Sequence, residues 1–266
     1  MDLQLLGRRA LITGSTAGIG FAAASALAGE GASVVLNGRT SERVEEAAGR
    51  VREGLGSSGG QVSGVAADLG TAEGVEEMLS QVPEVDVLVN NLGIFEPKEF
   101  AEITDEDWFR FFETNVMSGV RLARHYLPGM IERGWERIIF VSSESAVQIP
   151  AEMIHYGMTK TAQLAVARGL AETTTGTGVT VNSVLPGPTA SEGVTTFVGQ
   201  MAEAQGMSEG EMEVEFFRSA RPSSLLGRFI EPEEDGALKA YVASPLSSAT
   251  NGASLRVDGG VVRSIV

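Results

Sequence analysis

The sequence contains no cysteine and only two histidines, His125 and His155, among its 266 residues. Without cysteine the chain cannot form disulfides, thiolate metal sites or a cysteine nucleophile. Two histidines are also too few for a histidine-rich metal centre. These shortages exclude cysteine chemistry and lead us to expect no metal site.

Long apolar runs and basic residues are scarce as well. The longest apolar runs, such as residues 138–141, have the length of a strand, whereas a membrane-spanning helix needs about 20 apolar residues. Residues 1–14 leave no room for a secretion signal, so we expect a cytoplasmic protein. Lysine and arginine number 20 against 35 acidic residues, and the net charge of −15 repels nucleic acid and anionic membranes. We therefore expect a small-molecule partner, and neither a nucleic acid nor a membrane.

Short β-branched runs alternate with longer amphipathic stretches along the whole chain, which is typical of strand and helix units around a parallel sheet. Most strand candidates are apolar at nearly every position, as expected where helices cover both faces of the sheet. No linker or repeat divides the chain, so residues 1–266 are predicted to form one α/β domain, a doubly wound, seven-stranded parallel sheet of the Rossmann type. The predicted strands are 9–13, 33–37, 61–66, 85–90, 137–142, 179–185 and 253–257, and the predicted helices are 18–29, 40–54, 71–81, 105–133, 153–174 and 231–243.

A glycine-rich turn, TGSTAGIG at residues 13–20, lies between the first predicted strand and helix. Glycines let the backbone approach a pyrophosphate, and the free N–H groups at a helix start favour an anion. By itself such a turn is equally well explained by a tight strand-to-helix connection, so other motifs must decide. In a dinucleotide site the loop would contribute Gly14, Ser15, Thr16, Gly18, Ile19 and Gly20.

The Gly-x-x-x-Gly-x-Gly spacing of this turn resembles that of the short-chain dehydrogenase/reductase family. Further matching motifs follow in the family's order over essentially the whole chain: Asp68, Asn90-Asn91-Leu92-Gly93, Asn115, Ser143, Tyr156-x-x-x-Lys160, Pro186-Gly187 and Asp258-Gly259-Gly260. Leu92 replaces the alanine usual in the family, which affects local packing but removes no polar group. The resemblance implies a nicotinamide cofactor and an oxidoreductase that interconverts an alcohol and a carbonyl compound.

The same resemblance implies further contacts to the cofactor. Residues after the third and fourth strands would flank the adenine side, namely Asp68 and Asn90 to Gly93, and Leu69 would also bind the cofactor. Pro186 and Gly187 would lie against the nicotinamide, and Thr189 would contact its carboxamide. Tyr156 would stand beside the nicotinamide, and Lys160 would bind its ribose.

The end of the second predicted strand bears on the choice of cofactor. Folds that bind NAD usually place an acid there for the ribose hydroxyls, but residues 37–41 read NGRTS and contain no carboxylate. Arg39 can instead donate hydrogen bonds to a 2′-phosphate and stack on adenine. We therefore favour NADP(H). If Arg39 were only a solvated loop residue, NAD(H) would be the cofactor.

Tyr156 and Lys160 are four residues apart on a predicted helix, so their side chains share a face. Alone, this spacing more often joins a partly buried tyrosine and a solvated lysine. Ser143 ends the fifth strand, where an open parallel sheet binds its ligands, and the resemblance favours it over Ser142 as the catalytic serine. Asn115 lies within a predicted helix despite its low helix propensity. By resemblance these residues form a catalytic tetrad: Asn115, Ser143, Tyr156 and Lys160.

Reduction of a carbonyl requires a hydride from the nicotinamide and a proton for the developing alkoxide. A phenol can supply that proton if its pKa, ordinarily about 10, is lowered, and we expect Lys160 and the oxidised nicotinamide to lower the pKa of Tyr156. Ser143 would hydrogen-bond the substrate oxygen. By resemblance, Asn115 would hold a water that passes protons toward Lys160. The alternative is a regulator or scaffold that senses NADP(H) without turnover, which the complete tetrad disfavours.

Residues 191–221 form an insertion that is rich in methionine and phenylalanine. It is equally compatible with a mobile lid over an apolar substrate and with two amphipathic helices that cover the core. Glu96, Glu144 and His155 lie near the catalytic motifs and could recognise a polar substrate group. Such residues are usually solvated, however, so the polarity of the substrate stays open.

Two long helical stretches, 105–133 and 153–174, exceed what one core needs to cover. By resemblance they would pack against copies of themselves in a dimer or a homotetramer. Four aromatic residues fit either that interface or the core: Trp108, Phe109, Phe111 and Phe112.

Overall fold

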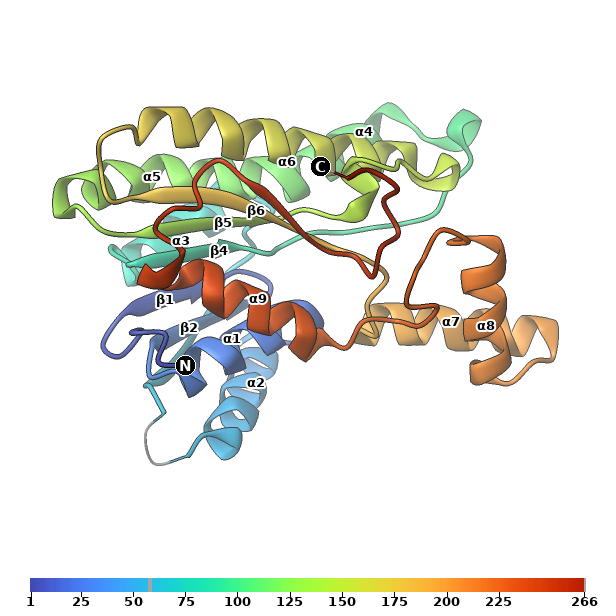
Figure 1. The fold of residues 1–266 in the computed structure, drawn as a ribbon, viewed down its shortest axis with the longest axis horizontal. Coiled ribbons are helices and arrows are strands. Elements are labelled where there is room, and N and C mark those ends of the chain that lie inside the picture. Colours follow the sequence, from blue (N-terminus) through green and yellow to red (C-terminus); the bar gives the residue numbers. More distant parts are fainter. Residues whose placement is uncertain (57–58, 266) are drawn as a thin grey trace.

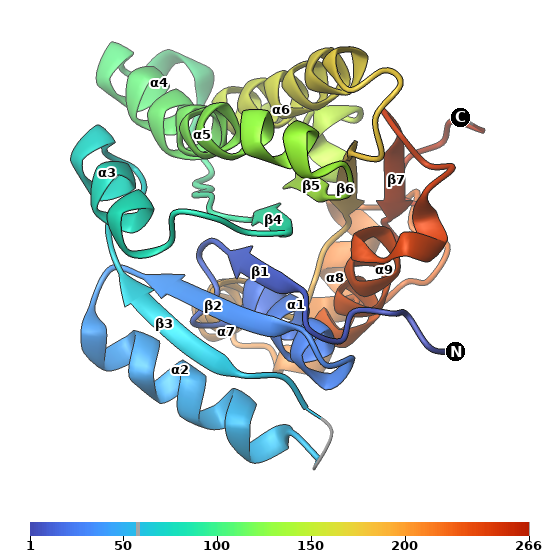
Figure 2. The ribbon, with the colours of Figure 1, turned by 90° about the vertical axis from the view of Figure 1, so that its left-hand side faces the viewer.

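The sheet has seven parallel strands in the order β3-β2-β1-β4-β5-β6-β7 in this computed structural model, which describes residues 1–56 and 59–265 (Figure 2). The chain begins at the centre, runs outward to β3, and returns to β4 before it continues to β7, so the carboxyl ends of β1 and β4 form the switch point where such sheets bind ligands. All seven predicted strands are confirmed to within two residues. They are β1 (Arg9–Ile12), β2 (Ser33–Gly38), β3 (Val62–Ala66), β4 (Val87–Asn90), β5 (Arg137–Val141), β6 (Thr180–Pro186) and β7 (Ser254–Val257).

Helices cover both faces of the sheet, as Figures 1 and 2 show. Threonine side chains cap three of them: Thr40, Thr71 and Thr104 each accept a hydrogen bond from the backbone N–H three residues further on. No helix among the described residues is long and apolar enough to cross a membrane. One face carries α3 (Ala72–Gln81), α4 (Asp105–Phe112), α5 (Ser118–Arg133) and α6 (Ile154–Thr173), and the other carries α1 (Gly18–Gly29), α2 (Ser41–Gly54) and α9 (Pro232–Ala243).

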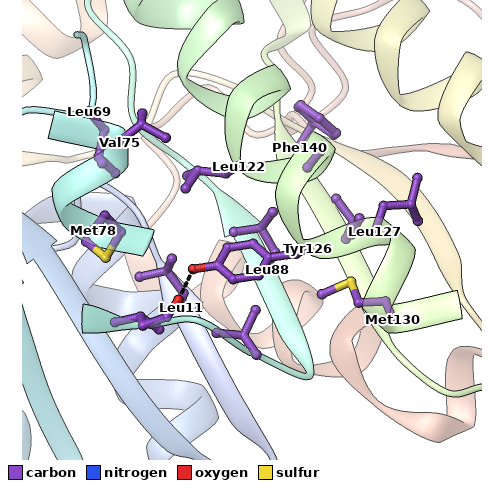
Figure 3. Close-up of a cluster of buried hydrophobic side chains, with 14 of the residues drawn as sticks. Leu11, Leu69, Val75, Met78, Leu88, Leu122, Tyr126, Leu127, Met130 and Phe140 are labelled. Carbon is purple, nitrogen blue, oxygen red and sulfur yellow. Dashed lines mark hydrogen bonds between the residues drawn. The ribbon is translucent and has the colours of Figure 1, made fainter. Parts of the chain in front are cut away.

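A separate apolar cluster fills the space between the sheet and each helical layer. Figure 3 shows the cluster under α3 and α5, where Leu11 and Leu88 of the sheet meet side chains of both helices. Tyr126 lies within this cluster, and its hydroxyl donates to the carbonyl of Val82 at 2.6 Å. Burial raises the pKa of Tyr126, so this phenol stays neutral and serves packing.

The predicted helix 105–133 is interrupted. After α4 the chain makes one π-helical turn, Glu113–Met117, before α5 begins. Asn115 is buried in this turn and holds neighbouring segments through its side chain and its carbonyl group. A π-turn inside an α-helix often marks a functional position. The poor helix propensity of Asn115 therefore pointed to a real break in the helix.

The insertion 191–221 contains two helices, α7 (Glu192–Gln205) and α8 (Glu209–Ser219), which stand at the side of the molecule in Figure 1. The prediction of two amphipathic helices is confirmed, but they do not cover either main cluster. They bury a small cluster of their own, made of Val198, Ala202, Met212, Phe217 and Phe229. The predicted motion of a lid stays a prediction.

The aromatic residues of α4 divide between the core and the surface. Phe111 is fully buried, whereas Phe109 is 74% exposed and Phe112 is 38% exposed. Phe111 packs against His155 of α6, with ring centres 4.1 Å apart, and Trp108 lies 6.0 Å from the same ring. Of these four residues, Phe109 and Phe112 are the most exposed, Trp108 is partly buried, and Phe111 belongs to the core.

Candidate active site

The glycine-rich loop between β1 and α1 is shaped by contacts that only glycine permits. Gly14 and Gly18 have φ angles of 59° and 55°, in the left-handed region. A Cβ atom on Gly20 would lie 2.5 Å from Asn91 Nδ2 and 2.5 Å from the Gly14 carbonyl oxygen. Asn91 Nδ2 itself donates to the carbonyls of Thr13 and Gly14 at 3.0 Å. Asn91 thus holds one side of the loop, and the other side lines a pocket.

The start of α1 has no capping side chain. Its N-cap residue is Ala17, so the first N–H groups of the helix receive no acceptor from that position. Ser15 is fully buried, and its Oγ donates to the Ile12 carbonyl at 2.7 Å and accepts from the Asn37 N–H at 2.9 Å. Uncapped N–H groups and the helix dipole favour a phosphate at this point. The loop therefore fits a pyrophosphate, while the side chain of Ser15, predicted to contact the cofactor, supports the loop from inside.

A pocket of about 470 Å³ lies beside this loop at the carboxyl ends of β1, β2 and β3. Asn37, at the end of β2, is buried and donates to the carbonyls of Val65 and Ala67. A Cβ atom on Gly38 would lie 2.5 Å from the methyl group of Thr16, so an acidic side chain has no room at that position. The pocket is lined by Asp68, Asn91 and Gly93, which were predicted to flank the adenine, and also by Leu69, Gly14, Thr16, Arg39 and Arg43. We name it the adenine pocket after that prediction.

Arg43 was not predicted from the sequence. It lies in the first turn of α2, and it lines the pocket together with Arg39, which precedes the helix. Its Nη2 also lies 3.4 Å from Glu192 Oε2 at the start of α7. This exposed ion pair connects the adenine pocket to the insertion.

Three pockets follow one another along the carboxyl edge of the sheet. The adenine pocket shares Asn91 and Gly93 with a middle pocket of about 250 Å³. The middle pocket in turn shares Ile19 and Tyr156 with a third pocket of about 330 Å³. The site is therefore long enough for an extended ligand that starts at Arg39 and ends beside Tyr156.

Ser143, Tyr156 and Lys160 meet where the middle and third pockets join. Ser143 follows β5, while Tyr156 and Lys160 lie one turn apart on α6. Lys160 Nζ is 5.6 Å from the centre of the Tyr156 ring and donates to the Val141 carbonyl at 3.0 Å. Ser142 Oγ donates to the carbonyl of Lys160 at 2.8 Å, so Ser142 fastens α6 to the sheet. The structure thus brings the hydroxyl groups of Ser143 and Tyr156 and the amine of Lys160 together.

Burial dominates the protonation of this cluster. It raises the pKa of Tyr156 above its usual value, although a hydrogen bond between Tyr156 and Ser143 acts in the opposite direction. Burial also lowers the pKa of Lys160 to about 7, and the charge of Lys239 adds to that effect. We expected Lys160 to lower the pKa of Tyr156, but in the protein alone the cost of burying a phenolate outweighs any such effect. The phenol is therefore held protonated, the form that donates a proton.

Asn115 reaches this cluster from the π-turn. Its Nδ2 donates to the Ile94 carbonyl and to Thr159 Oγ1, both at 3.0 Å, and its Oδ1 accepts from the Ile94 N–H at 2.8 Å. A Cβ atom on Gly93 would lie 3.3 Å from Lys160 Nζ and 3.5 Å from Asn115 Oδ1, so the three residues converge. Asn115 therefore joins the segment after β4 to α6. Its predicted role in holding a water stays a prediction.

The segment after β6 forms one wall of the third pocket. Pro186, Gly187 and Thr189 all line it, as predicted for the nicotinamide end. A Cβ atom on Gly187 would lie 2.6 Å from the carbonyl oxygen of Asp258, which explains glycine at this position. Thr189 Oγ1 donates to the Gly187 carbonyl at 2.9 Å and thereby holds the turn.

Comparison with known proteins agrees with this site. Residues 8–201 match the family model described as short chain dehydrogenase. The chain belongs to the short-chain dehydrogenase/reductase family. It is accordingly an oxidoreductase that acts on CH–OH or carbonyl groups.

Relatives of this short-chain dehydrogenase match it over its whole length. An uncharacterized oxidoreductase of Bacillus subtilis, YvaG, is 50% identical, with 100% of both chains covered. A D-beta-hydroxybutyrate dehydrogenase of Cupriavidus necator is 32% identical, with 97% of this chain and 99% of the relative covered. The crystal structure of L-sorbose reductase from Gluconobacter frateurii, complexed with NADPH and L-sorbose, is 33% identical and superposes with a TM-score of 0.91 over 100% of both chains.

The third pocket of this short-chain dehydrogenase, beside Ser143 and Tyr156, is mainly apolar. Its apolar side chains come from the segment after β4 and from the insertion with the residues that follow it, and they include Phe95, Val194, Met201, Phe216 and Phe229. The insertion therefore forms a wall of this pocket.

One buried ion pair interrupts the apolar lining. Arg221 Nε donates to Glu144 Oε1 at 3.1 Å, and the two side chains are only 10% and 5% exposed. Arg221 Nη1 lies 3.7 Å from Glu152, which is also at the pocket. Ser143 Oγ donates to the second carboxylate oxygen of Glu144. Ser143 is thus connected to Arg221, the last residue of the insertion, through one carboxylate.

The three polar residues near the catalytic motifs differ in their position relative to the third pocket. Glu144 lines the third pocket, whereas Glu96 is exposed and paired with Arg110 at 2.8 Å. His155 is buried under α4, and burial lowers its pKa. Arg221 gave no sequence signal, because it meets its partner across 77 positions of the chain.

Proposed function

We propose that the protein is an NADP(H)-dependent oxidoreductase that interconverts a carbonyl compound and an alcohol, with Tyr156 as proton donor and acceptor. One observation carries this proposal: Ser143, Tyr156 and Lys160 meet at one end of a continuous row of pockets whose other end contains Arg39 and the glycine-rich loop. That arrangement gives a dinucleotide a place to bind and leaves the third pocket for a small substrate. Asn115 supports the same cluster from behind.

The residues of the cluster divide the work. Ser143 and Tyr156 bind the carbonyl oxygen in the third pocket, and a bound nicotinamide supplies or accepts the hydride. Tyr156 donates its phenolic proton to the oxygen, and its raised pKa keeps that proton in place at neutral pH. Lys160, with its pKa of about 7, can hold or release a proton near neutrality and can bind a ribose hydroxyl.

The choice of NADP(H) over NAD(H) rests on the adenine pocket. Two arginines, Arg39 and Arg43, line it, and the contact of Gly38 with Thr16 leaves no room for an acid at the end of β2. Arginine pairs with phosphate by charge and by directed hydrogen bonds. The L-sorbose reductase structure contains NADPH, and a 3-oxoacyl (acyl-carrier-protein) reductase from Agrobacterium tumefaciens, 28% identical, has NADP bound.

We also propose that the protein forms a homo-oligomer, a dimer or a tetramer, through the face that carries α4. Phe109 and Phe112 leave apolar surface exposed there, and Phe100 of a neighbouring turn is 63% exposed. Exposed apolar patches of this kind usually mark contacts between proteins. Mass measurement in solution tests this proposal, and a monomer at micromolar concentration would contradict it. The cytoplasmic location stays a prediction from the sequence.

The central test replaces Tyr156 by phenylalanine, which removes only the hydroxyl group. We expect the Tyr156→Phe protein to bind NADPH within about twofold of the unaltered protein and to lose at least about 100-fold in ketone turnover. NADPH binding is followed by fluorescence titration and turnover by the absorbance of NADPH. Tyr241→Phe is the matched control, since Tyr241 lies on α9 outside the three pockets.

Near-normal turnover by Tyr156→Phe would refute the role of this residue. The alternative function, a cofactor-sensing regulator or scaffold, predicts a different result. In that case the unaltered protein would bind NADPH tightly but would oxidise it with no member of a panel of ketones, quinones and acyl thioester ketones.

A further inference from the structure

The serine that binds the substrate oxygen already gives its proton to a buried carboxylate. Ser143 Oγ donates to Glu144 Oε2 and accepts from the Ser145 N–H at 3.1 Å. A serine hydroxyl has a single proton to donate. While that proton points to Glu144, it cannot point to the carbonyl oxygen of a substrate. Binding of a carbonyl group through Ser143 therefore removes a hydrogen bond from Glu144.

This loss matters because Glu144 is only 4% exposed and water cannot easily replace the bond. The partners that remain are the Ser145 N–H, at 2.9 Å from the same oxygen, and Arg221 on the other oxygen. A buried acceptor that loses a partner weakens binding unless the ligand restores the bond. A hydroxyl group on the carbon next to the carbonyl can restore it, because it lies beside the carbonyl oxygen just as Glu144 lies beside Ser143.

The local charge argues against an acidic substrate. Two carboxylates, Glu144 and Glu152, surround the single cation Arg221, so the group carries one net negative charge. The guanidinium of Arg221 already donates through Nε to Glu144 and through Nη1 to the Ala220 carbonyl. A substrate carboxylate beside Glu144 would be repelled by that buried carboxylate, while the half-exposed Glu152 competes for the same cation. The apolar lining of the rest of the pocket favours an uncharged remainder.

We propose that the substrate is an uncharged α-hydroxy ketone and that Glu144 selects it by accepting a hydrogen bond from its hydroxyl group. This inference rests on the proposed function. The carbonyl carbon gains a hydride from NADPH and the carbonyl oxygen gains the proton of Tyr156, so the product is a 1,2-diol and NADP⁺. The hydroxyl next to the carbonyl is unchanged by the reaction.

A matched series of four-carbon ketones tests the proposal: 2-butanone, 1-hydroxy-2-butanone and 2-oxobutanoate. We expect the unaltered protein to show the highest kcat/KM for the hydroxy ketone. Glu144→Gln should lower the ratio of kcat/KM for 1-hydroxy-2-butanone to kcat/KM for 2-butanone about tenfold. It should raise the kcat/KM for 2-oxobutanoate relative to that for 2-butanone. Comparing ratios between the two proteins cancels the intrinsic reactivity of each ketone. Glu203→Gln, an exposed substitution on α7 outside the pockets, should leave both ratios unchanged.

The outcomes separate the two proposals. If Glu144→Gln slows all three ketones equally, Glu144 only positions Ser143 and the substrate proposal is wrong. If the unaltered protein reduces no ketone at all, the proposed function fails instead.

A second measurement needs no variant and therefore does not depend on whether Glu144→Gln folds. In the presence of NADPH, 1,2-butanediol should bind the unaltered protein about tenfold more tightly than 2-butanol, because the diol alone can donate to Glu144. Equal dissociation constants would overturn the proposal.

Discussion

The two ends of the active site are built in opposite ways. At the cofactor end, backbone atoms form the binding surface, and glycines are needed because a Cβ atom on Gly20 would collide with Asn91 and Gly14. At the substrate end, side chains from distant segments form the wall, and the pair Glu144 and Arg221 joins residues 77 positions apart. A binding surface made of backbone can be recognised in the sequence, because it requires glycines at fixed spacing. A pocket made of side chains from distant segments has no such short sequence motif.

The same substitution at both ends gives the largest contrast. Gly20→Ala should weaken NADPH binding about 100-fold or more and lower stability by about 1 to 3 kcal/mol, because the added methyl group meets backbone and the Asn91 amide. Gly199→Ala, in the middle of α7, should instead raise stability by about 0.5 to 1 kcal/mol, since its Cβ atom meets only Glu209 Oε1 at 3.7 Å. Fluorescence titration and chemical denaturation measure both effects. Equal changes in NADPH affinity and in stability for the two variants would contradict the proposed difference between the two ends of the site.

A smaller effect is expected from the arginine at the outer edge of the cofactor end. Arg39→Ser should weaken NADPH binding about 10- to 100-fold and leave NADH binding within about twofold, because only NADPH carries the 2′-phosphate. Arg124→Ser, on the exposed surface of α5, is the control for the loss of one positive charge. An equal effect on both cofactors would show that Arg39 does not distinguish them.

The smallest effect concerns the ion pair that connects the two ends. Arg43 and Glu192 are 56% and 67% exposed, so their attraction contributes about 0 to 1 kcal/mol. Glu192→Gln should free Arg43 for the phosphate and tighten NADPH binding about two- to threefold at low salt, with no difference at high salt. Titrations at two ionic strengths measure this change. A weaker affinity in the variant would mean that Glu192 assists the cofactor and does not compete with it.

The fold was predictable because its evidence is local and repeated. Most strands were located from their apolar runs, since the central strands of a parallel sheet are covered on both faces, whereas the edge strands β3 and β7 carry exposed polar residues. The break at Asn115 was missed because a single π-turn adds only one residue to an otherwise helical stretch, too little to be seen in the apolar pattern. Asparagine at that position was the available signal.

The site was only partly predictable for a related reason. Spacing on one helix placed Tyr156 and Lys160 together, but it could not reveal that burial raises the pKa of Tyr156. Desolvation depends on everything packed around a group, not on its neighbours in sequence. Arg221 was missed for the same reason, because only the folded chain brings it to Glu144.

The small apolar cluster of α7 and α8 has a consequence for how substrate range changes. Because Met212 and Phe217 pack with Phe229 and neither main cluster includes them, replacements among them alter one wall of the pocket while the nucleotide-binding body keeps its packing. Mutations in this cluster can therefore change the substrate specificity without weakening the binding of the coenzyme. Laboratory diversification of this outlying helical hairpin offers the same freedom to protein engineers.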